Sequence, residues 1–139
     1  MEIIYTLDRI FEVAEQLAAF LENYRVVALS GSMGAGKTTL VHALCRQLGV
    51  TETVSSPTFA LIQEYRGSRY PVIYHIDLYR INSAAEALDA GMEDCLLSGH
   101  LCFVEWPERA PGLLPDDTLH VILDIQSPVE RKLTVELPQ

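Results

Sequence analysis

Residues 31–39 carry the most specific chemistry in this sequence. They read G-S-M-G-A-G-K-T-T and fit G-x-x-x-x-G-K-[ST], the phosphate-binding P-loop. Glycines let the backbone turn so that consecutive N–H groups converge on anionic oxygens. Lys37 can reach the β- and γ-phosphates, the Thr38 hydroxyl can ligate magnesium, and Thr39 is expected to bond an α-phosphate oxygen. The predicted nucleotide-binding loop consists of Gly31, Ser32, Met33, Gly34, Ala35, Gly36, Lys37, Thr38 and Thr39.

The segments on either side of this loop are those that the motif requires. Residues 25–30 form a short apolar, β-branched run that is typical of a buried parallel strand. Residues 40–48 carry apolar side chains at helical spacing, and Gly49 follows as a stop signal. A helix that begins near Lys37 directs the positive end of its dipole at the same phosphates.

Two other apolar runs are predicted strands that end in an acid. Residues 71–77 end at Asp77, in the manner of a Walker B strand, and residues 101–105 end at Glu105. Ligands of open α/β sheets bind outside the carboxyl ends of the strands, so both acids can face one crevice. We assign Asp77 and Glu105 jointly to the metal and the attacking water, with Glu105 the better candidate for polarising water. The alternative is that either acid caps a helix or pairs with an arginine.

Two other polar residues have a functional and a structural interpretation. Thr58 lies in the polar, proline-containing segment 51–59, which could close over the γ-phosphate as switch loops do. Its hydroxyl could then serve the magnesium or the water, but an ordinary connecting loop fits the spacing equally well. His75 is interpreted as a hydrogen-bonded structural residue of its strand.

The remaining patterns predict an α/β fold in which one domain spans residues 1–139. We expect a mixed, mostly parallel central sheet flanked by helices, with a C-terminal antiparallel hairpin. An amphipathic helix capped by Thr6 or Asp8 precedes the strand of the loop, and a capping box at 83–86 opens a short helix that ends at Gly91. The other expected elements are a strand at 2–5, the first helix at 7–21, a hairpin of 59–65 and 72–77, a short helix at 92–97, and terminal strands at 118–125 and 132–137.

Composition narrows the function classes. The net charge is −9, and Lys37 and Lys132 are the only lysines. This argues against a general nucleic-acid binder, which neutralises phosphates with Lys and Arg. The acidic surface favours a basic protein partner or simple solubility.

The sequence also predicts a cytoplasmic protein with no membrane partner. No apolar run approaches the roughly 20 residues of a membrane span, and the N-terminus lacks the basic start of a secretory signal. The cysteines are three and scattered, which suggests neither a disulfide framework nor a zinc site. Cys45 and Cys102 lie in apolar runs and are expected to be small core residues.

Four motifs occur in an order and spacing that resemble the TsaE (YjeE-type) family. They are SGSMGAGKTT at 30–39, SPTF at 56–59, HIDLYR at 75–80 and EWPE at 105–108. The resemblance extends over nearly the whole chain. The family consists of small bacterial ATPases that take part in the synthesis of tRNA threonylcarbamoyladenosine, a modification of the adenosine next to the anticodon.

The resemblance implies a P-loop ATPase that binds Mg-ATP and hydrolyses it weakly. It implies TsaD and TsaB as partner proteins, with tRNA reached only through the complex. The family's functional positions fall on Lys37, Thr38, Thr39, Thr58, Asp77, Glu105 and Trp106. Ser32 and Met33 depart mildly from the family pattern, but they precede the contact glycines, so nucleotide binding is still expected.

Two other functions remain open at this stage. A small phosphotransferase would need a substrate-binding insertion and a lid that excludes water, and the sequence offers little room for either. A nucleotide-dependent binding module would use ATP to order segment 51–59 against a partner. Arg80 and Arg109 are candidates for an arginine that stabilises the transition state, although the sequence places neither of them clearly.

Overall fold

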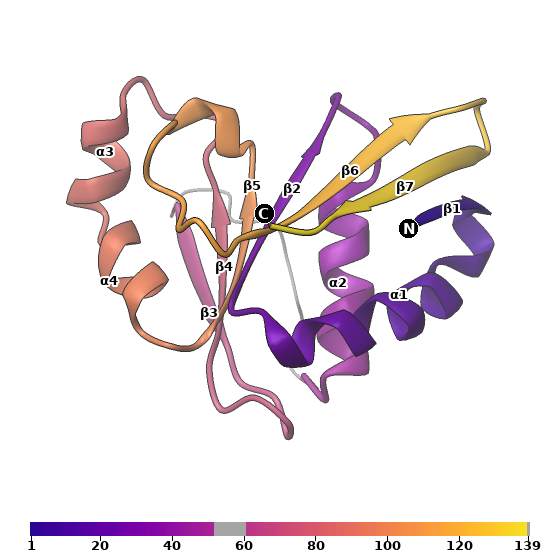
Figure 1. The fold of residues 1–139 in the computed structure, drawn as a ribbon, viewed down its shortest axis with the longest axis horizontal. Coiled ribbons are helices and arrows are strands. Elements are labelled where there is room, and N and C mark those ends of the chain that lie inside the picture. The colour runs from indigo at the N-terminus through magenta and orange to yellow at the C-terminus, as the bar shows by residue number, and fades with distance from the viewer. Residues whose placement is uncertain (52–60, 139) are drawn as a thin grey trace.

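The computed structural model describes residues 1–51 and 61–138, and its centre is a mixed β-sheet (Figure 1). Within the described ranges the sheet has seven strands in the order β1-β7-β6-β2-β5-β4-β3. The four central strands β6, β2, β5 and β4 are parallel, and the outer pairings are antiparallel. The strands are β1 (Glu2–Thr6), β2 (Val26–Gly31), β3 (Ile62–Tyr65), β4 (Ile73–Asp77), β5 (Leu101–Glu105), β6 (Leu119–Ile125) and β7 (Glu130–Glu136). The expected mixed sheet with a parallel centre is confirmed.

Helices cover both faces of the sheet, because the central strands are apolar on both sides. On one face, Val27, Leu29 and Phe103 pack with the buried side chains of α1 (Ile10–Ala18) and α2 (Lys37–Gln47). On the other face, Val26 and Val104 pack with α3 (Ala84–Asp89) and α4 (Met92–Leu97). Figure 1 shows the two helix pairs on opposite sides of the sheet. Strands that are buried on both faces favour continuous apolar runs, as the sequence has here.

The first helix is the element that differs most from its prediction. The expected helix over 7–21 is an α-helix only at Ile10–Ala18, with 3₁₀ turns at Leu7–Arg9 and Ala19–Asn23. A 3₁₀ turn has three residues per turn, so side chains within it rotate off the α-helical stripe. Leu7 lies in the first of these turns, and 41% of its surface is exposed. Phe11 lies in the α-helix itself, and 52% of its surface is exposed, although both residues belonged to the predicted apolar face.

Smaller differences occur at helix and strand ends. Ser83 is the N-cap of α3, but its side chain makes no cap hydrogen bond, and the Glu86 carboxylate instead accepts one from the Asn82 amide at 3.0 Å. The predicted capping box is therefore wrong in its side-chain contacts. The helix that was predicted to end at Gly91 already ends at Asp89. Gly91, with φ of 96°, is instead the N-cap of α4. Strand β3 begins at Ile62, and residues 59–60 of its predicted range lie outside the described residues.

The terminal hairpin is confirmed and is part of the main sheet. Its strands β6 and β7 are antiparallel, and β6 continues the parallel centre next to β2. Strand β7 in turn pairs with β1, so the first and last strands lie side by side. The hairpin thereby extends the sheet on the side of β2 opposite to β5.

The structure tests the expectations for the cysteines and for membrane-spanning segments. Cys45 and Cys102 are fully buried, as expected for core residues, and burial raises the pKa of the Cys102 thiol to about 12. None of the three cysteines, all of which lie in the described ranges, forms a disulfide bond. Among the helices in the described part of the chain, none combines the length and apolarity that a membrane crossing needs.

The corrected first helix yields a stability test. Leu17 has no exposed surface, whereas about half of Phe11 is exposed. We expect Leu17→Ala to lower the free energy of unfolding by about 2–5 kcal/mol, because it deletes buried methyl groups and leaves a cavity. Phe11→Ala should change it by only about 0.5 kcal/mol, as at other surface positions. Urea denaturation measures both changes. An equal loss of unfolding free energy in the two variants would show that Phe11 belongs to the buried face, as the sequence predicted.

Candidate functional site

The loop 31–39 leaves β2 and enters α2 at Lys37 through a backbone that requires glycine. Gly34 and Gly36 have φ of 81° and 98°, in the left-handed region where side chains are disfavoured. At Gly31 an added Cβ would lie 2.6 Å from the carbonyl oxygen of Leu123 on β6. Glycine is therefore required at Gly34 and Gly36 by the backbone conformation and at Gly31 by the close contact with the neighbouring strand.

The loop borders a cavity of about 290 Å³ at the carboxyl ends of the parallel strands. Its lining combines the loop, the start of α2, both predicted acids and two aromatic rings. The lining residues are Met33, Gly34, Ala35, Gly36, Lys37, Thr38, Thr39, Asp77, Tyr79, Glu105 and Trp106. Gly31 and Ser32 of the predicted set are not part of the lining, and Thr58 lies outside the described residues.

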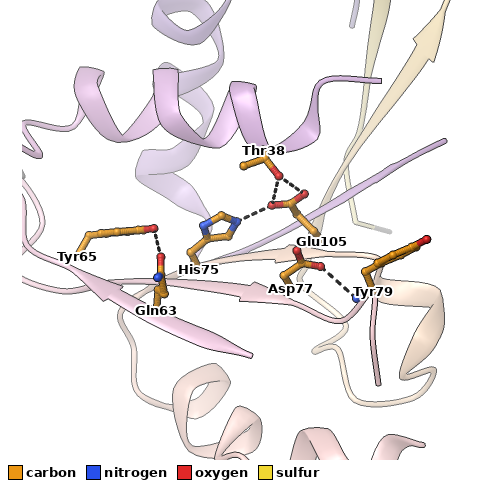
Figure 2. Close-up of polar contacts among 7 residues, drawn as sticks. All are labelled: Thr38, Gln63, Tyr65, His75, Asp77, Tyr79 and Glu105. Atoms are coloured by element: carbon orange, nitrogen blue, oxygen red, sulfur yellow. Dashed lines mark hydrogen bonds and ion pairs between the residues drawn. The ribbon is translucent and has the colours of Figure 1, made fainter. Parts of the chain in front are cut away.

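Glu105 is the buried centre of a polar network at this cavity (Figure 2). The Thr38 hydroxyl lies 2.8 Å from Oε1 and 3.0 Å from Oε2 of its carboxylate. The Nε2 atom of His75 lies 2.5 Å from Oε2. The partners of Glu105 are thus a hydroxyl and an imidazole, rather than the arginine or helix end considered from the sequence.

The sheet register explains why these side chains meet. Asp77 on β4 pairs directly with Glu105 on β5, so the two acids are neighbours on one face. Side chains alternate along a strand, so His75 shares that face two residues before Asp77. This face is covered by α2, whose first turn supplies Thr38. Sequence reasoning interpreted His75 as a hydrogen-bonded structural residue of its strand. Alternation along the strand could place it on the face of Asp77, but its contact with Glu105 depends on the register between β4 and β5.

Asp77 has a different environment from its neighbour. Its Oδ1 atom accepts a hydrogen bond from the Tyr79 N–H at 3.0 Å, and the residue is partly exposed to the cavity. Burial raises the pKa of Asp77, and the Tyr79 hydrogen bond opposes that rise. One carboxylate oxygen is therefore committed to the local turn, and the other has no hydrogen-bond partner among the described residues.

Lys37 is buried and held by two groups of the site. Its Nζ atom donates to the carbonyl oxygen of Gly31 and lies 3.5 Å from the centre of the Trp106 ring. Burial lowers the pKa of Lys37, while the acids Glu105, Glu108 and Asp77 act in the opposite direction. An ammonium group over an indole face is stabilised by the ring quadrupole.

Trp106 reaches Lys37 because its own backbone is unusual. With φ of 58°, it is the one non-glycine residue in the left-handed region within the described ranges. Such a conformation is uncommon for a bulky side chain and clusters at functional sites. Its ring lies 5.0 Å from the Tyr79 ring, and the Arg109 guanidinium lies 6.0 Å from the Trp106 ring. The sequence could not show this stacking, because it depends on the turn after β5.

The donor set at the cavity suits magnesium better than a tightly caged metal. Within residues 1–51 and 61–138 there is no group of three or more His, Cys, Asp or Glu placed to hold a metal ion. The available oxygens are the Thr38 hydroxyl and the carboxylates of Asp77 and Glu105. Magnesium is commonly bound in this way, with one or two carboxylates, substrate phosphates and waters.

Comparison with known proteins places this chain in a family. Residues 4–133 match the family model described as "Threonylcarbamoyl adenosine biosynthesis protein TsaE". The chain is 37% identical over 115 residues to the tRNA threonylcarbamoyladenosine biosynthesis protein TsaE of Treponema pallidum, covering 83% of this chain and 84% of that protein. It is 35% identical over 122 residues to the protein of the same name from Bacillus subtilis, covering 88% and 75%.

A solved structure supports the same assignment. The crystal structure of YdiB from Bacillus subtilis superposes on the whole chain and on 87% of its own length, with a TM-score of 0.77 and 26% sequence identity. The fold, the family model and the sequence relatives agree with the resemblance carried by the four motifs. The chain belongs to the TsaE family of tRNA threonylcarbamoyladenosine biosynthesis proteins.

Proposed function

We propose that this chain is a slow ATPase that binds Mg-ATP in the loop 31–39 and supports tRNA threonylcarbamoyladenosine synthesis together with TsaD and TsaB. The observation that carries the proposal is that the loop, Lys37 and Thr38 share one cavity with Asp77 and Glu105. The family membership supports the pathway. TsaD and TsaB are proposed as partners because the motifs resemble those of the family.

The loop supplies the groups that a polyphosphate needs. Backbone N–H groups of Gly34, Gly36 and Lys37 form the nest, and the first turn of α2 adds its dipole. Lys37 contributes a full charge for the β- and γ-phosphates, and Thr39 lines the cavity where the α-phosphate is expected. Backbone conformation and side-chain chemistry therefore point to the same ligand class.

Magnesium is needed because the cavity also carries negative charge. Asp77 and Glu105 face the position of the phosphates, and the chain as a whole has a net charge of −9. Thr38, Asp77 and Glu105 are the residues that would hold the ion. When bound, magnesium supplies charge neutralisation for the phosphate oxygens.

Glu105 is better placed than Asp77 to orient the attacking water. His75 fixes its Oε2 atom, whereas among the described residues Oε1 is engaged only by the Thr38 hydroxyl. A Thr38 hydroxyl that turns toward the metal would release Oε1, which could then accept a hydrogen bond from water. Asp77 keeps one oxygen for the metal. This division of labour follows from the contacts of each carboxylate.

Turnover is expected to be slow in the isolated chain. The cavity lining contains one cation, Lys37, and no arginine among the described residues. An arginine that touches the transferring phosphoryl group is worth a factor of about 10³–10⁵ in rate in other P-loop enzymes. Arg109 stacks near Trp106 and Tyr79 and remains a candidate, as does a group supplied by a partner. Thr58, which the motif resemblance assigns to the nucleotide, remains part of the proposal.

The single tryptophan is a reporter for nucleotide binding. Lys37 lies over the Trp106 ring and must leave it to reach the phosphates. We expect Mg-ATP to change the fluorescence of Trp106, and Lys37→Met to change the emission without nucleotide. Lys132→Met removes the only other lysine, which pairs with Glu2 on the edge strand β1, and should leave the emission unchanged. Trp106 emission that changes neither with Mg-ATP nor in Lys37→Met would contradict the proposed movement of Lys37.

Two substitutions separate binding from hydrolysis. Lys37→Met should weaken Mg-ATP binding by about tenfold or more, because it removes the only full positive charge in the loop. Glu105→Gln should largely spare binding and lower hydrolysis by about 10²-fold or more, as loss of a general base does. Calorimetry and phosphate release measure the two effects. Chelation of magnesium should weaken binding in the wild-type chain, and unchanged turnover in Glu105→Gln would remove Glu105 from the mechanism.

The partners provide the test of the pathway assignment. ATP hydrolysis by this chain should rise when TsaD and TsaB are added, since positioning and charge stabilisation account for nearly all catalysis of phosphoryl transfer. The Glu105→Gln chain mixed with the same partners is the matched control and should stay near its basal rate. Equal wild-type rates with and without the partners would defeat the proposal. Phosphate that appears on a small molecule instead of in solution would favour a phosphotransferase.

A further inference from the structure

Arg131 joins the last strand of the sheet to the loop 31–39. It lies on β7, only 8% of its surface is exposed, and it is 96 residues from Ala35 in the sequence. Its Nε atom donates to the Ala35 carbonyl oxygen at 3.2 Å, and Nη2 donates to the Gly34 carbonyl oxygen at 3.4 Å. Nη1 donates to the carbonyl oxygens of Ser127 and Glu130 at 2.9 and 3.0 Å. One guanidinium therefore connects the turn of the hairpin with the loop.

The partners of Arg131 are all backbone carbonyl groups. None of the ion pairs in the described part of the chain involves this residue. A buried charge is costly unless hydrogen bonds satisfy it, and here four carbonyl oxygens do so. No carboxylate of the described residues lies within ion-pair distance of its positive charge, which lies directly beside the loop.

The contacts fix the direction of two consecutive peptide groups. In a trans peptide the C=O and the following N–H point in opposite directions, and the described chain has no cis peptide bond. Holding the Ala35 carbonyl toward Arg131 turns the Gly36 N–H away from it. Holding the Gly34 carbonyl does the same for the Ala35 N–H, which closes the loop by donating to the Ser32 carbonyl at 3.1 Å.

We propose that Arg131 is a positioning residue that shapes the loop 31–39 for polyphosphate binding. It holds the carbonyl groups of Gly34 and Ala35 on the hairpin side, so that the Gly36 N–H is directed to the other side and the Ala35 N–H closes the loop onto Ser32. Its positive charge also favours an anion at the loop. The inference deepens the proposed function and depends on it for the identity of the ligand, but the effect on the loop is independent of any ligand.

The test uses three variants of the full chain. Arg131→Met removes the donors and the charge, and Arg131→Lys keeps the charge but cannot span both carbonyl groups. Lys132→Met is the matched control, because it removes one charge from the next position, where the side chain pairs with Glu2 at 3.5 Å. Arg131→Lys also serves if Arg131→Met does not fold. Amide hydrogen exchange and calorimetry with Mg-ATP are the two measurements.

We expect the Ala35 amide to exchange about tenfold faster or more in Arg131→Met, since charge-assisted hydrogen bonds that hold the loop are lost. The amides of the β6–β7 ladder should change much less. Arg131→Lys should lie between wild type and Arg131→Met, and Lys132→Met should match wild type. Mg-ATP affinity should fall in the same order, by about tenfold in Arg131→Met.

The outcomes distinguish this inference from the proposed function. Unchanged Ala35 exchange and unchanged Mg-ATP affinity in both Arg131 variants would overturn the positioning role while leaving the ATPase proposal intact. Exchange that rises equally across the loop and the ladder would show a general structural role and would also overturn it. Faster exchange of Ala35 alone, in a chain whose wild type binds no Mg-ATP, would uphold the control of loop shape and overturn the nucleotide function.

Discussion

The Glu105 carboxylate is the contact on which the arrangement of the site depends. It joins the first turn of α2 through Thr38 to strand β4 through His75, and it ends β5 itself. A buried carboxylate needs such partners, because an unpaired charge in the interior is costly. The parallel register then places Asp77 beside it. The acids therefore face the loop as a consequence of strand pairing and one hydrogen-bonded network.

The loop is held from its other side by the C-terminal hairpin. Strand β6 contacts Gly31 so closely that a side chain there would meet the Leu123 carbonyl, and Arg131 on β7 holds the carbonyl groups of Gly34 and Ala35. The hairpin is thus more than an edge that completes the sheet. It fixes the loop against the same strand, β2, whose other neighbour β5 supplies Glu105.

Local patterns in the sequence predicted the parts of the fold that depend on local physics. The helix at 92–97 and the strand at 101–105 have the predicted bounds. Gly34 and Gly36 have the left-handed backbone conformations that the spacing of the loop motif indicates. Periodicity overextended the first helix, because it does not distinguish an α-helix from the 3₁₀ turns that flank Ile10–Ala18. Contacts between distant residues were missed. The bonds of His75 to Glu105 and of Arg131 to Ala35 depend on register and tertiary packing, which no pattern in one strand encodes.

The most direct measurement is a crystal structure of the chain with magnesium and a non-hydrolysable ATP analogue. The account predicts phosphate oxygens on the N–H groups of the loop, the Lys37 ammonium moved from Trp106 to the phosphates, and the Thr38 hydroxyl turned from Glu105 to the metal. His75 should remain bonded to Glu105. A nucleotide bound elsewhere, or a Thr38 hydroxyl still on Glu105 with the analogue in the loop, would contradict the account.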